Sequence, residues 1–479
     1  MSAVSLRRGW CPGARRPMET GDGLLVRVHP LGGVLSAAQA QALAEAAEAC
    51  GNGLLDVTAR GNLQIRGVSE ATHPAVLERL SGIGLLEEDK DGPYRLTLVS
   101  PLAGIDPAEA FDAAALAAEI AARVGDAAAA LPAKFYISVD GGGALPLEPG
   151  ADVWVAPAEG GVAIGLAAGD GYVWQGPVPL ETAAEAVAIA LAAFLQARGD
   201  ARRMRDLPPA AAEAIAAAMT RATVSSFPVG EGGSAEPRRM GRAGRAFGEA
   251  ETDGASPDTA VSASRNAALA RRAPSVTPLR GAPPSPTGKE KRVAGFICDG
   301  ALLLALPFGR MTAAQLRAAA NWAEAHAAGE LRLSFTRGIL IPNVSPAVAE
   351  TIAREAEAAG FVTDPDDPRL ALVACPGAPA CGRGHTPAPQ DALALAEAVQ
   401  PLAATGARLH VSACPKGCAH PRAADLTLVG RPDGRYDVIP GGAAGDRPAA
   451  ALPLPAIAAI LRRTHDLRGL PAAFGDHEP

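Results

Sequence analysis

Two stretches of the chain show the same order of apolar and polar positions. An apolar strand that ends in Pro and Gly is predicted over residues 22–32 and again over 299–309. Ser36 and Thr312 follow as N-caps, and each is followed by an Ala-rich segment that predicts a helix. A second apolar strand comes next, at 54–65 and at 331–342. The pattern therefore predicts a strand–helix–strand unit twice, that is, a duplicated α+β unit.

The two copies align at a spacing of 277 residues, which pairs Arg60-Gly61 with Arg337-Gly338. A period this long indicates duplication of a domain and not a solenoid. The similarity continues beyond the units, because residues 95–99 resemble 369–373 and residues 135–141 stand where the second copy has 409–415. The first copy lacks cysteines at these places, so we expect metal chemistry in the second copy alone.

Composition limits the possible classes of function. The chain has 479 residues, 48% of them hydrophobic and 20% charged, which is enough for two to four domains with sizeable cores. Its formal charge of −7 shows no basic excess, so general nucleic-acid binding is not indicated. The first residues lack the apolar core of a signal peptide, and no uninterrupted apolar run has membrane-spanning length. With seven cysteines, this predicts a protein of the reducing cytoplasm that contacts no membrane.

Four cysteines near the C-terminus carry the candidate chemistry. They follow the pattern Cys-x5-Cys and, about thirty residues later, Cys-x3-Cys: Cys375, Cys381, Cys414 and Cys418. Four thiolates from two Gly/Pro-rich loops can hold one [4Fe–4S] cluster. Structural zinc and two disulfides are the alternatives, although zinc pairs usually have tighter spacings and nothing indicates export. The pattern favours a redox enzyme.

The cysteine pattern, the Arg-Gly strand ends and the segment Leu131-Pro132-Ala133-Lys134-Phe135 resemble the nitrite/sulfite reductase superfamily over nearly the whole chain. The resemblance implies an α+β fold with two pseudo-symmetric halves, each with a ferredoxin-like unit and a cluster-domain-like unit. The expected domains are a ferredoxin-like unit at 1–88, a unit without cysteine ligands at 89–225, a disordered linker at 226–291, a second ferredoxin-like unit at 292–362 and the [4Fe–4S]-binding unit at 363–479. The linker follows from its Gly, Ser, Pro, Ala and Arg content.

The resemblance also implies where ligands bind. In that family sirohaem lies between the halves, the last cysteine couples the cluster to it, and basic residues bind its carboxylates and the anionic substrate. Guanidinium forks suit such carboxylates. The candidate substrate-binding residues are Arg60, Arg66, Arg95, Lys134, Arg337, Arg369 and Lys416. For any one of them the alternative is an ordinary ion pair.

One position departs from the reductases. Their segment reads Lys-Phe-Lys, and both lysines serve reduction of the anion, whereas this chain has Tyr136 in the second place. Loss of a cation from a site that must bind an anion and deliver protons argues against nitrite or sulfite reduction. The best resemblance is to the oxygen-dependent members that hydroxylate a carboxylated tetrapyrrole, with γ-lactone formation, in aerobic cobalamin biosynthesis.

That resemblance implies an NADH- and O2-dependent monooxygenase. It also implies a mononuclear non-haem iron, for which His29, His385 and His420 are candidates and ordinary loop histidines the alternative. No Gly-x-Gly-x-x-Gly follows a strand, so a separate reductase is expected to pass electrons from NADH. The rival hypotheses are a sirohaem-dependent nitrite or sulfite reductase and a non-enzymatic cluster or zinc protein.

Overall fold

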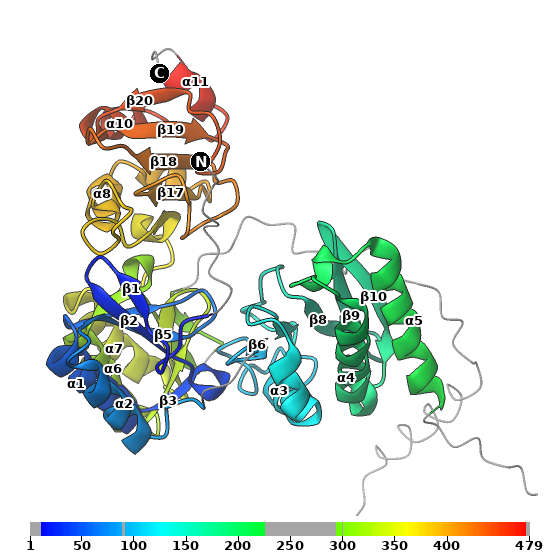
Figure 1. The fold of residues 1–479 in the computed structure, drawn as a ribbon. Helices are drawn as coiled ribbons and strands as arrows, with labels where there is room; N and C mark the ends of the chain where they lie inside the picture. Colours follow the sequence, from blue (N-terminus) through cyan, green and yellow to red (C-terminus); the bar gives the residue numbers. More distant parts are fainter. Residues whose placement is uncertain (1–10, 89–91, 226–293, 299, 476–479) are drawn as a thin grey trace, which may run out of the picture.

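The computed structural model describes residues 11–88, 92–225, 294–298 and 300–475. The predicted linker at 226–291 lies outside the described residues. Within the described part, the chain forms four five-stranded sheets, here called sheets A to D. Figure 1 shows sheets A and B together in one body, with sheet C beside it and sheet D above it.

Sheets A and B belong to the two ferredoxin-like units. Sheet A has the order β1 (Met18–Thr20), β2 (Gly23–Val28), β5 (Leu63–Val68), β4 (Leu54–Val57) and β13 (Arg310–Thr312). Sheet B has the order β11 (Gly295–Ile297), β12 (Ala301–Ala305), β15 (Gly338–Pro342), β14 (Glu330–Leu333) and β3 (Val34–Ser36). Their helices are α1 (Ala37–Cys50), α2 (His73–Gly82), α6 (Ala313–His326) and α7 (Pro346–Ala358).

The two units exchange one strand each. β3 of the first copy pairs with β14 of the second, and β13 of the second copy pairs with β4 of the first. One hydrophobic core then contains residues of both copies, for example Leu43 of α1 and Leu316 of α6. This reciprocal exchange gives the pseudo-two-fold arrangement that the sequence predicted.

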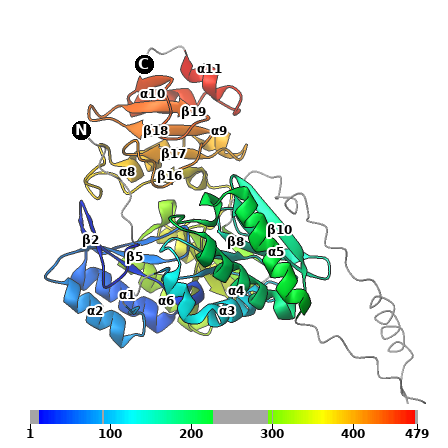
Figure 2. The same cartoon turned by 45° about the vertical axis from the view of Figure 1, so that its right-hand side comes forward.

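Sheets C and D complete the two halves. Sheet C has the order β10 (Gly171–Val178), β9 (Gly161–Ala168), β8 (Val153–Ala158), β7 (Ile137–Val139) and β6 (Thr97–Val99), and carries α3 (Ala113–Val124), α4 (Leu180–Ala197) and α5 (Pro209–Ser225). Sheet D has the order β16 (Leu372–Ala374), β17 (Leu409–Ser412), β18 (Leu426–Gly430), β19 (Tyr436–Pro440) and β20 (Ala450–Leu452). Its helices are α8 (Ala388–Leu395), α9 (Gln400–Ala403), α10 (Leu454–Leu461) and α11 (Leu470–Gly475). Figure 2 shows α4 and α5 lying together over sheet C.

Helix α4 is, by length and composition, the one helix of the described residues that would suit a membrane span. In the fold it is a core helix, because Val187, Leu191 and Phe194 are buried in the hydrophobic core of sheet C.

The helix starts follow the sequence closely. The side chain of Ser36 accepts a hydrogen bond from the backbone of Gln39 at 3.1 Å, and the Gln39 side chain accepts one from the backbone of Ser36. Thr312 and Gln315 form the same capping box at α6. Each box satisfies backbone N–H groups that a helix start leaves without partners.

The repeat alignment inferred from the sequence is wrong by one residue. In the structure Thr58 N donates to Asn62 O, and Ser334 N donates to Gly338 O. The structural spacing is therefore one residue shorter than the sequence alignment, and Arg337, with φ of 66°, takes the place of Gly61, with φ of 60°. The matched Arg-Gly dipeptides misled the alignment, since register depends on which side chains face the core.

Candidate functional site

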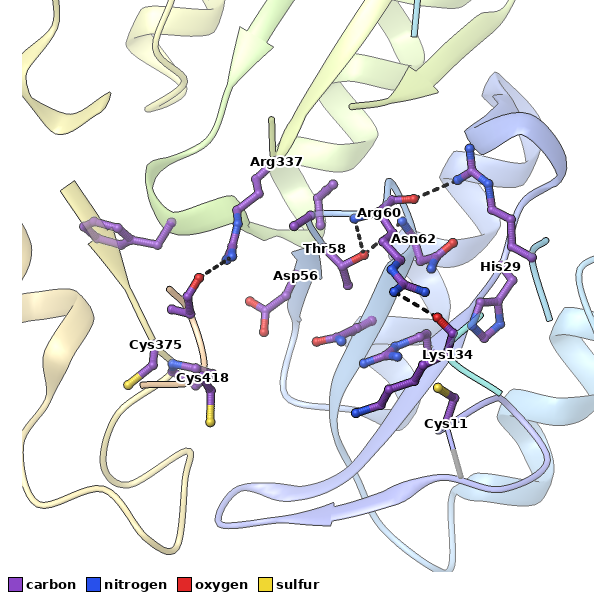
Figure 3. A pocket seen from close by; sticks show the side chains of 18 of the residues that line it. Cys11, His29, Asp56, Thr58, Arg60, Asn62, Lys134, Arg337, Cys375 and Cys418 are labelled. Carbon is purple, nitrogen blue, oxygen red and sulfur yellow. Dashed lines mark hydrogen bonds between the residues drawn. The ribbon is translucent and has the colours of Figure 1, made fainter. Parts of the chain in front are cut away.

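A pocket of about 610 Å³ opens between sheet A and the cysteine loops of the second copy. Its wall combines the sheet face turned away from the core, the turn at 58–62, the segment at 133–136, and parts of both cysteine loops. The volume lies within the range of roughly 300–1,000 Å³ typical of small-molecule and cofactor sites. In Figure 3, Cys375 and Cys418 lie on one side of the pocket, and Arg60, Lys134 and His29 lie on the other.

The pocket-facing side of sheet A is polar because of strand alternation. In β2, Val26 and Val28 are buried in the core, so Arg27 between them points to the opposite face. The strand register places Arg27 beside Gln64 and Gln64 beside Asp56. A row of three polar side chains therefore forms the floor of the pocket.

The equivalent face of sheet B is closed by apolar packing. At the structural register, Leu303 and Leu340 occupy the positions of Arg27 and Gln64. Both leucines pack against Leu102, which lies in the loop after β6 of the first copy. The pseudo-symmetric position is thus filled by hydrophobic side chains, and the polar floor occurs on the sheet A side.

A tight turn between β4 and β5 presents Arg60. Thr58 Oγ1 accepts hydrogen bonds from the backbone N–H of Arg60 at 3.3 Å and of Asn62 at 3.2 Å. Arg95 Nη1 donates to the carbonyl of Arg60 at 2.9 Å and of Gly61 at 3.1 Å. Arg95 therefore clamps the turn from behind, and the Arg60 side chain extends along the pocket wall.

Arg337 connects the pocket with a cysteine loop. Its Nη2 donates to the carbonyl of Ala419 at 3.0 Å, next to Cys418. The backbone of Arg337 is left-handed, with φ of 66°, which is uncommon for a residue other than glycine. The fold holds this bulky residue in a strained conformation where the first copy has a glycine, and its side chain reaches the loop of Cys418.

Four arginines line the pocket without a carboxylate partner among the described residues: Arg27, Arg60, Arg95 and Arg337. Burial lowers the pKa of each of them, to about 10 for Arg95. Arginine nevertheless stays charged at neutral pH. Buried charge without a counter-charge is unfavourable, so this part of the pocket is suited to an anionic ligand.

One carboxylate in the pocket has its own cation. Asp56 accepts from Arg310 Nε at 2.8 Å and from Nη2 at 3.2 Å. This pair joins β4 of the first copy to β13 of the second. It therefore belongs to the strand exchange, although Asp56 also lies 3.6 Å from Arg66 and its charge acts on Arg337.

His29 is a neutral group in this cationic pocket. Its ring stacks on Tyr94 with centroids 4.8 Å apart. Burial, followed by the charges of Arg27 and Arg95, lowers the pKa of His29 to about 3. Its buried Nδ1 has no hydrogen-bond partner among the described residues.

The four predicted cluster cysteines come from the ends of two adjacent parallel strands. β16 pairs in parallel with β17, so the loops that follow them emerge at the same edge of sheet D. Cys375 Sγ accepts a hydrogen bond from Ala413 N at 3.2 Å. Burial raises the pKa of Cys375 and of Cys418, and the neighbouring thiols add to the rise.

These residues match the predicted [4Fe–4S] cluster in donor type, and their loops emerge at the same edge of sheet D. The four side chains are free thiols that influence one another electrostatically, and thiolates are the usual ligands of such clusters. Among the described residues, no group of three or more His, Cys, Asp or Glu side chains is placed to hold a single metal ion. The geometry therefore assigns no ligand set to a mononuclear iron. His420 instead contacts the carbonyl of Ala423, and the backbone of His385 bonds to Ala413.

The structure brings together only part of the predicted cationic set. Arg60, Arg95, Lys134 and Arg337 line the pocket, whereas Arg66, Arg369 and Lys416 do not. Arg66 is buried and bonded to Asp22 at 2.6 Å, and it also donates to the carbonyl of Ala380. Arg369 is paired with Asp367 at 2.7 Å. Arg66 and Arg369 are thus paired with aspartates, and Lys416 lies outside the pocket lining.

Two pocket arginines were missed by the sequence prediction, namely Arg27 and Arg310. The available signal was an arginine in the middle of an otherwise apolar strand, because Arg27 is flanked by Val26 and Val28. Arg310 gave no comparable signal, since its strand is short and enters the other copy's sheet.

Comparison with known families identifies the same two units. The family described as "Nitrite/Sulfite reductase ferredoxin-like half domain" matches residues 16–82 and 301–359. The chain is also similar to the structure of the NirA protein of Mycobacterium tuberculosis, with a TM-score of 0.62 and 20% identity. That likeness covers 92% of this chain and 81% of NirA, and it shows the fold.

Two curated relatives extend over nearly the whole chain. A precorrin-3B synthase of Sinorhizobium sp is 31% identical over 94% of this chain and 86% of the relative. A ferredoxin–nitrite reductase of Synechococcus elongatus is 28% identical over 90% of this chain and 82% of the relative. The two relatives differ in the reaction that their names state.

Proposed function

The chain belongs to the family that contains the nitrite and sulfite reductases and precorrin-3B synthase, and on this basis we propose that it acts as a precorrin-3B synthase. In this proposal it is an oxygen-dependent monooxygenase of aerobic cobalamin biosynthesis. It hydroxylates the macrocycle of precorrin-3A, and the ring A acetate closes to a γ-lactone. One atom of O2 enters the product and the other leaves as water, with both electrons coming from NADH through a separate reductase.

The unpaired arginines of the pocket carry this proposal. Precorrin-3A has a rim of acetate and propionate groups, so a matching site needs several fixed cations. Arg27, Arg60 and Arg337 lie around one pocket without carboxylate partners among the described residues, and Lys134 lines the same pocket. A guanidinium can bind a carboxylate through two parallel hydrogen bonds, which favours a carboxylated ligand.

The cysteine loops would supply the redox function. Cys375, Cys381, Cys414 and Cys418 would hold the [4Fe–4S] cluster, which supplies single electrons when bound. Cys375 and Cys418 also line the pocket that contains the arginines. Arg337 bridges the two parts through its hydrogen bond to the Ala419 carbonyl. The protein's own contribution would be to keep the cluster and the macrocycle next to each other.

The second candidate function is a sirohaem-dependent nitrite or sulfite reductase. It is favoured by the nitrite reductase relative, which matches nearly the whole chain. Tyr136 opposes it, because a phenol stands in the pocket where the reductases are expected to have a lysine. Burial raises the pKa of Tyr136, so the side chain stays neutral and cannot replace the cation.

Anaerobic purification tests these alternatives first. We expect a brown protein with about four sulfides and at least about four irons per chain, and no sharp tetrapyrrole bands in the visible spectrum. Intense sirohaem bands would identify the reductase, and stoichiometric zinc without sulfide would contradict both functions. The second step is incubation with precorrin-3A, O2, NADH and a reductase. Mass spectrometry should show one added oxygen atom, and no oxygenation by the cluster-loaded protein would refute the synthase.

A further inference from the structure

The guanidinium of Arg60 lies on an aromatic ring. Its central carbon is 4.0 Å from the centroid of the Tyr136 ring, which is a close cation–π contact. Its Nη2 also donates to the carbonyl of Lys134 at 3.3 Å. Within the described part of the chain, Arg60 has no carboxylate partner. The ring and one carbonyl therefore hold the cation while other N–H groups remain available to a ligand.

The Tyr136 ring has a rigid support. The backbone N–H of Tyr136 donates to Asp152 Oδ2 at 3.1 Å, and the Asp152 side chain is fully buried. Arg203 pairs with Asp152 at 2.9 Å and donates to the carbonyl of Gly150 at 3.0 Å. Arg203 also lies 5.6 Å from the Tyr136 ring. The buried carboxylate of this ion pair thus fixes the backbone of the residue on which Arg60 rests.

We propose that Tyr136 is a positioning residue that determines specificity, because its ring orients Arg60 to receive a carboxylate on the rim of a large tetrapyrrole. This inference rests on the proposed function and adds a residue to it. A free arginine loses side-chain entropy when a ligand immobilises it, and an arginine already held on a ring loses less. A lysine at position 136 would repel Arg60 and provide no surface for it.

A double-mutant cycle on tetrapyrrole affinity tests the proposal. The probe is uroporphyrin III, an air-stable octacarboxylate, titrated into the full chain and followed by its fluorescence. We expect Tyr136→Leu to weaken binding by about tenfold, which corresponds to the cost of immobilising one flexible side chain on binding. Tyr136→Phe is the matched control, because it keeps the ring, and should stay within about twofold of the wild type.

The cycle is completed in the Arg60→Ala background. If Tyr136 acts through Arg60, adding Tyr136→Leu to Arg60→Ala should change the affinity by less than about twofold. An equal loss in both backgrounds would overturn the proposal, since Tyr136 would then contact the ligand itself. Should the Leu variant fail to fold, as judged by near-UV circular dichroism, Tyr136→Met takes its place in the cycle.

The outcomes separate this inference from the proposed function. If Arg60→Ala weakens binding and Tyr136→Leu does not, the positioning role is wrong and the pocket assignment stands. If the wild type does not bind uroporphyrin III, or Arg60→Ala binds it as tightly, the pocket assignment fails and the inference with it. The inference is supported if Arg60→Ala and Tyr136→Leu each weaken the binding of uroporphyrin III, the two effects are not additive, and Tyr136→Phe keeps the wild-type affinity.

Discussion

Arg337 combines backbone strain with a position in the pocket. A left-handed conformation costs a residue with a side chain about 1–2 kcal/mol, and the first copy avoids this cost with Gly61. We expect Arg337→Gly to stay within about 1 kcal/mol of the wild-type stability, because relief of strain offsets the lost bond to Ala419. The affinity of the Arg337→Gly variant for uroporphyrin III should fall about tenfold, which is the effect expected when one hydrogen bond to a charged group is lost.

Ala328→Gly is the matched control for strain relief. Ala328 also has a positive φ, of 53°, but it is exposed at the end of α6 and outside the pocket. The control should gain about 1 kcal/mol of stability without any change in affinity. If Arg337→Gly kept wild-type affinity, Arg337 would be removed from the ligand-binding set.

The burial of His29 predicts how stability depends on pH. Its pKa falls from 6.5 to about 3 on folding, so the folded state disfavours the proton that the unfolded state binds. The contribution to stability is complete above pH 6.5 and is lost as the pH falls toward 3. When the pH falls from 7.5 to 5.5, the free energy of unfolding should therefore decrease by about 1 kcal/mol.

Chemical unfolding of His29→Gln at both pH values measures that contribution. Because glutamine does not titrate, the variant should lose about 1 kcal/mol less than the wild type over this interval. His465→Gln is the control, since His465 is exposed. An identical pH dependence in His29→Gln and the wild type would show that His29 is not buried as a neutral group.

At the scale of elements, local signals predicted the starts of two helices well. The N-caps Ser36 and Thr312 are confirmed, because a capping box involves only neighbours in sequence. The superfamily resemblance and the α+β fold are confirmed by the relatives. The repeat register was wrong, since a matched dipeptide carries no information about which strand face meets the core.

The site residues were less predictable for a related reason. The sequence shows that Arg66 and Arg369 are positively charged, but it does not show that each is paired with an aspartate in the fold. Arg60 and Arg337 reached the same pocket although they are not equivalent in the repeat. Their role in ligand binding stays a prediction, as does the role of the four cysteines in binding a cluster.

The loops at the ends of the parallel strands are held differently in the two copies. In the first copy Asp106 accepts from Ala144 N at 2.6 Å, and Asp140 accepts from Leu147 N at 3.1 Å. The first of these bonds ties the two loops together, and the second lies within the loop that follows β7. In the second copy the corresponding loops carry the cysteines, so we expect the cluster to be their main cross-link.

Removal of the cluster should therefore loosen one copy only. We expect the Cys375→Ser variant to lose iron and sulfide. The rate of hydrogen exchange at residues 375–385 and 413–421 should rise by tenfold or more, which corresponds to a free energy of local opening that is lower by about 1.4 kcal/mol. Exchange at residues 100–112 and 140–147 of the same sample is the internal control and should not change. Unaltered iron and sulfide content would contradict the cluster assignment.

At the scale of the whole molecule, strand exchange makes the two halves interdependent. β13 of the second copy completes sheet A, β3 of the first completes sheet B, and a single core contains both. The ion pair between Arg310 and Asp56 crosses the same boundary. Neither ferredoxin-like unit therefore has a complete sheet of its own. The domain limits proposed from sequence stay predictions.

This interdependence predicts complementation by fragments. We expect 1–225 and 292–479, expressed separately, to leave α1 and α6 without protection from hydrogen exchange, because each fragment exposes an edge strand and half of a shared core. Sheets C and D have cores of their own and can still fold in these fragments. When the two fragments are co-expressed with a tag on one of them, they should purify together. Their affinity for uroporphyrin III should lie within about tenfold of that of the intact chain, because a covalent link between fragments changes their effective concentration and not the contacts they make. A control pair cut at Asp433-Gly434, in the β18–β19 turn, leaves both exchanged strands and their partner strands on one fragment. Protection of α1 from hydrogen exchange in 1–225 alone would show that the exchange is not needed for folding.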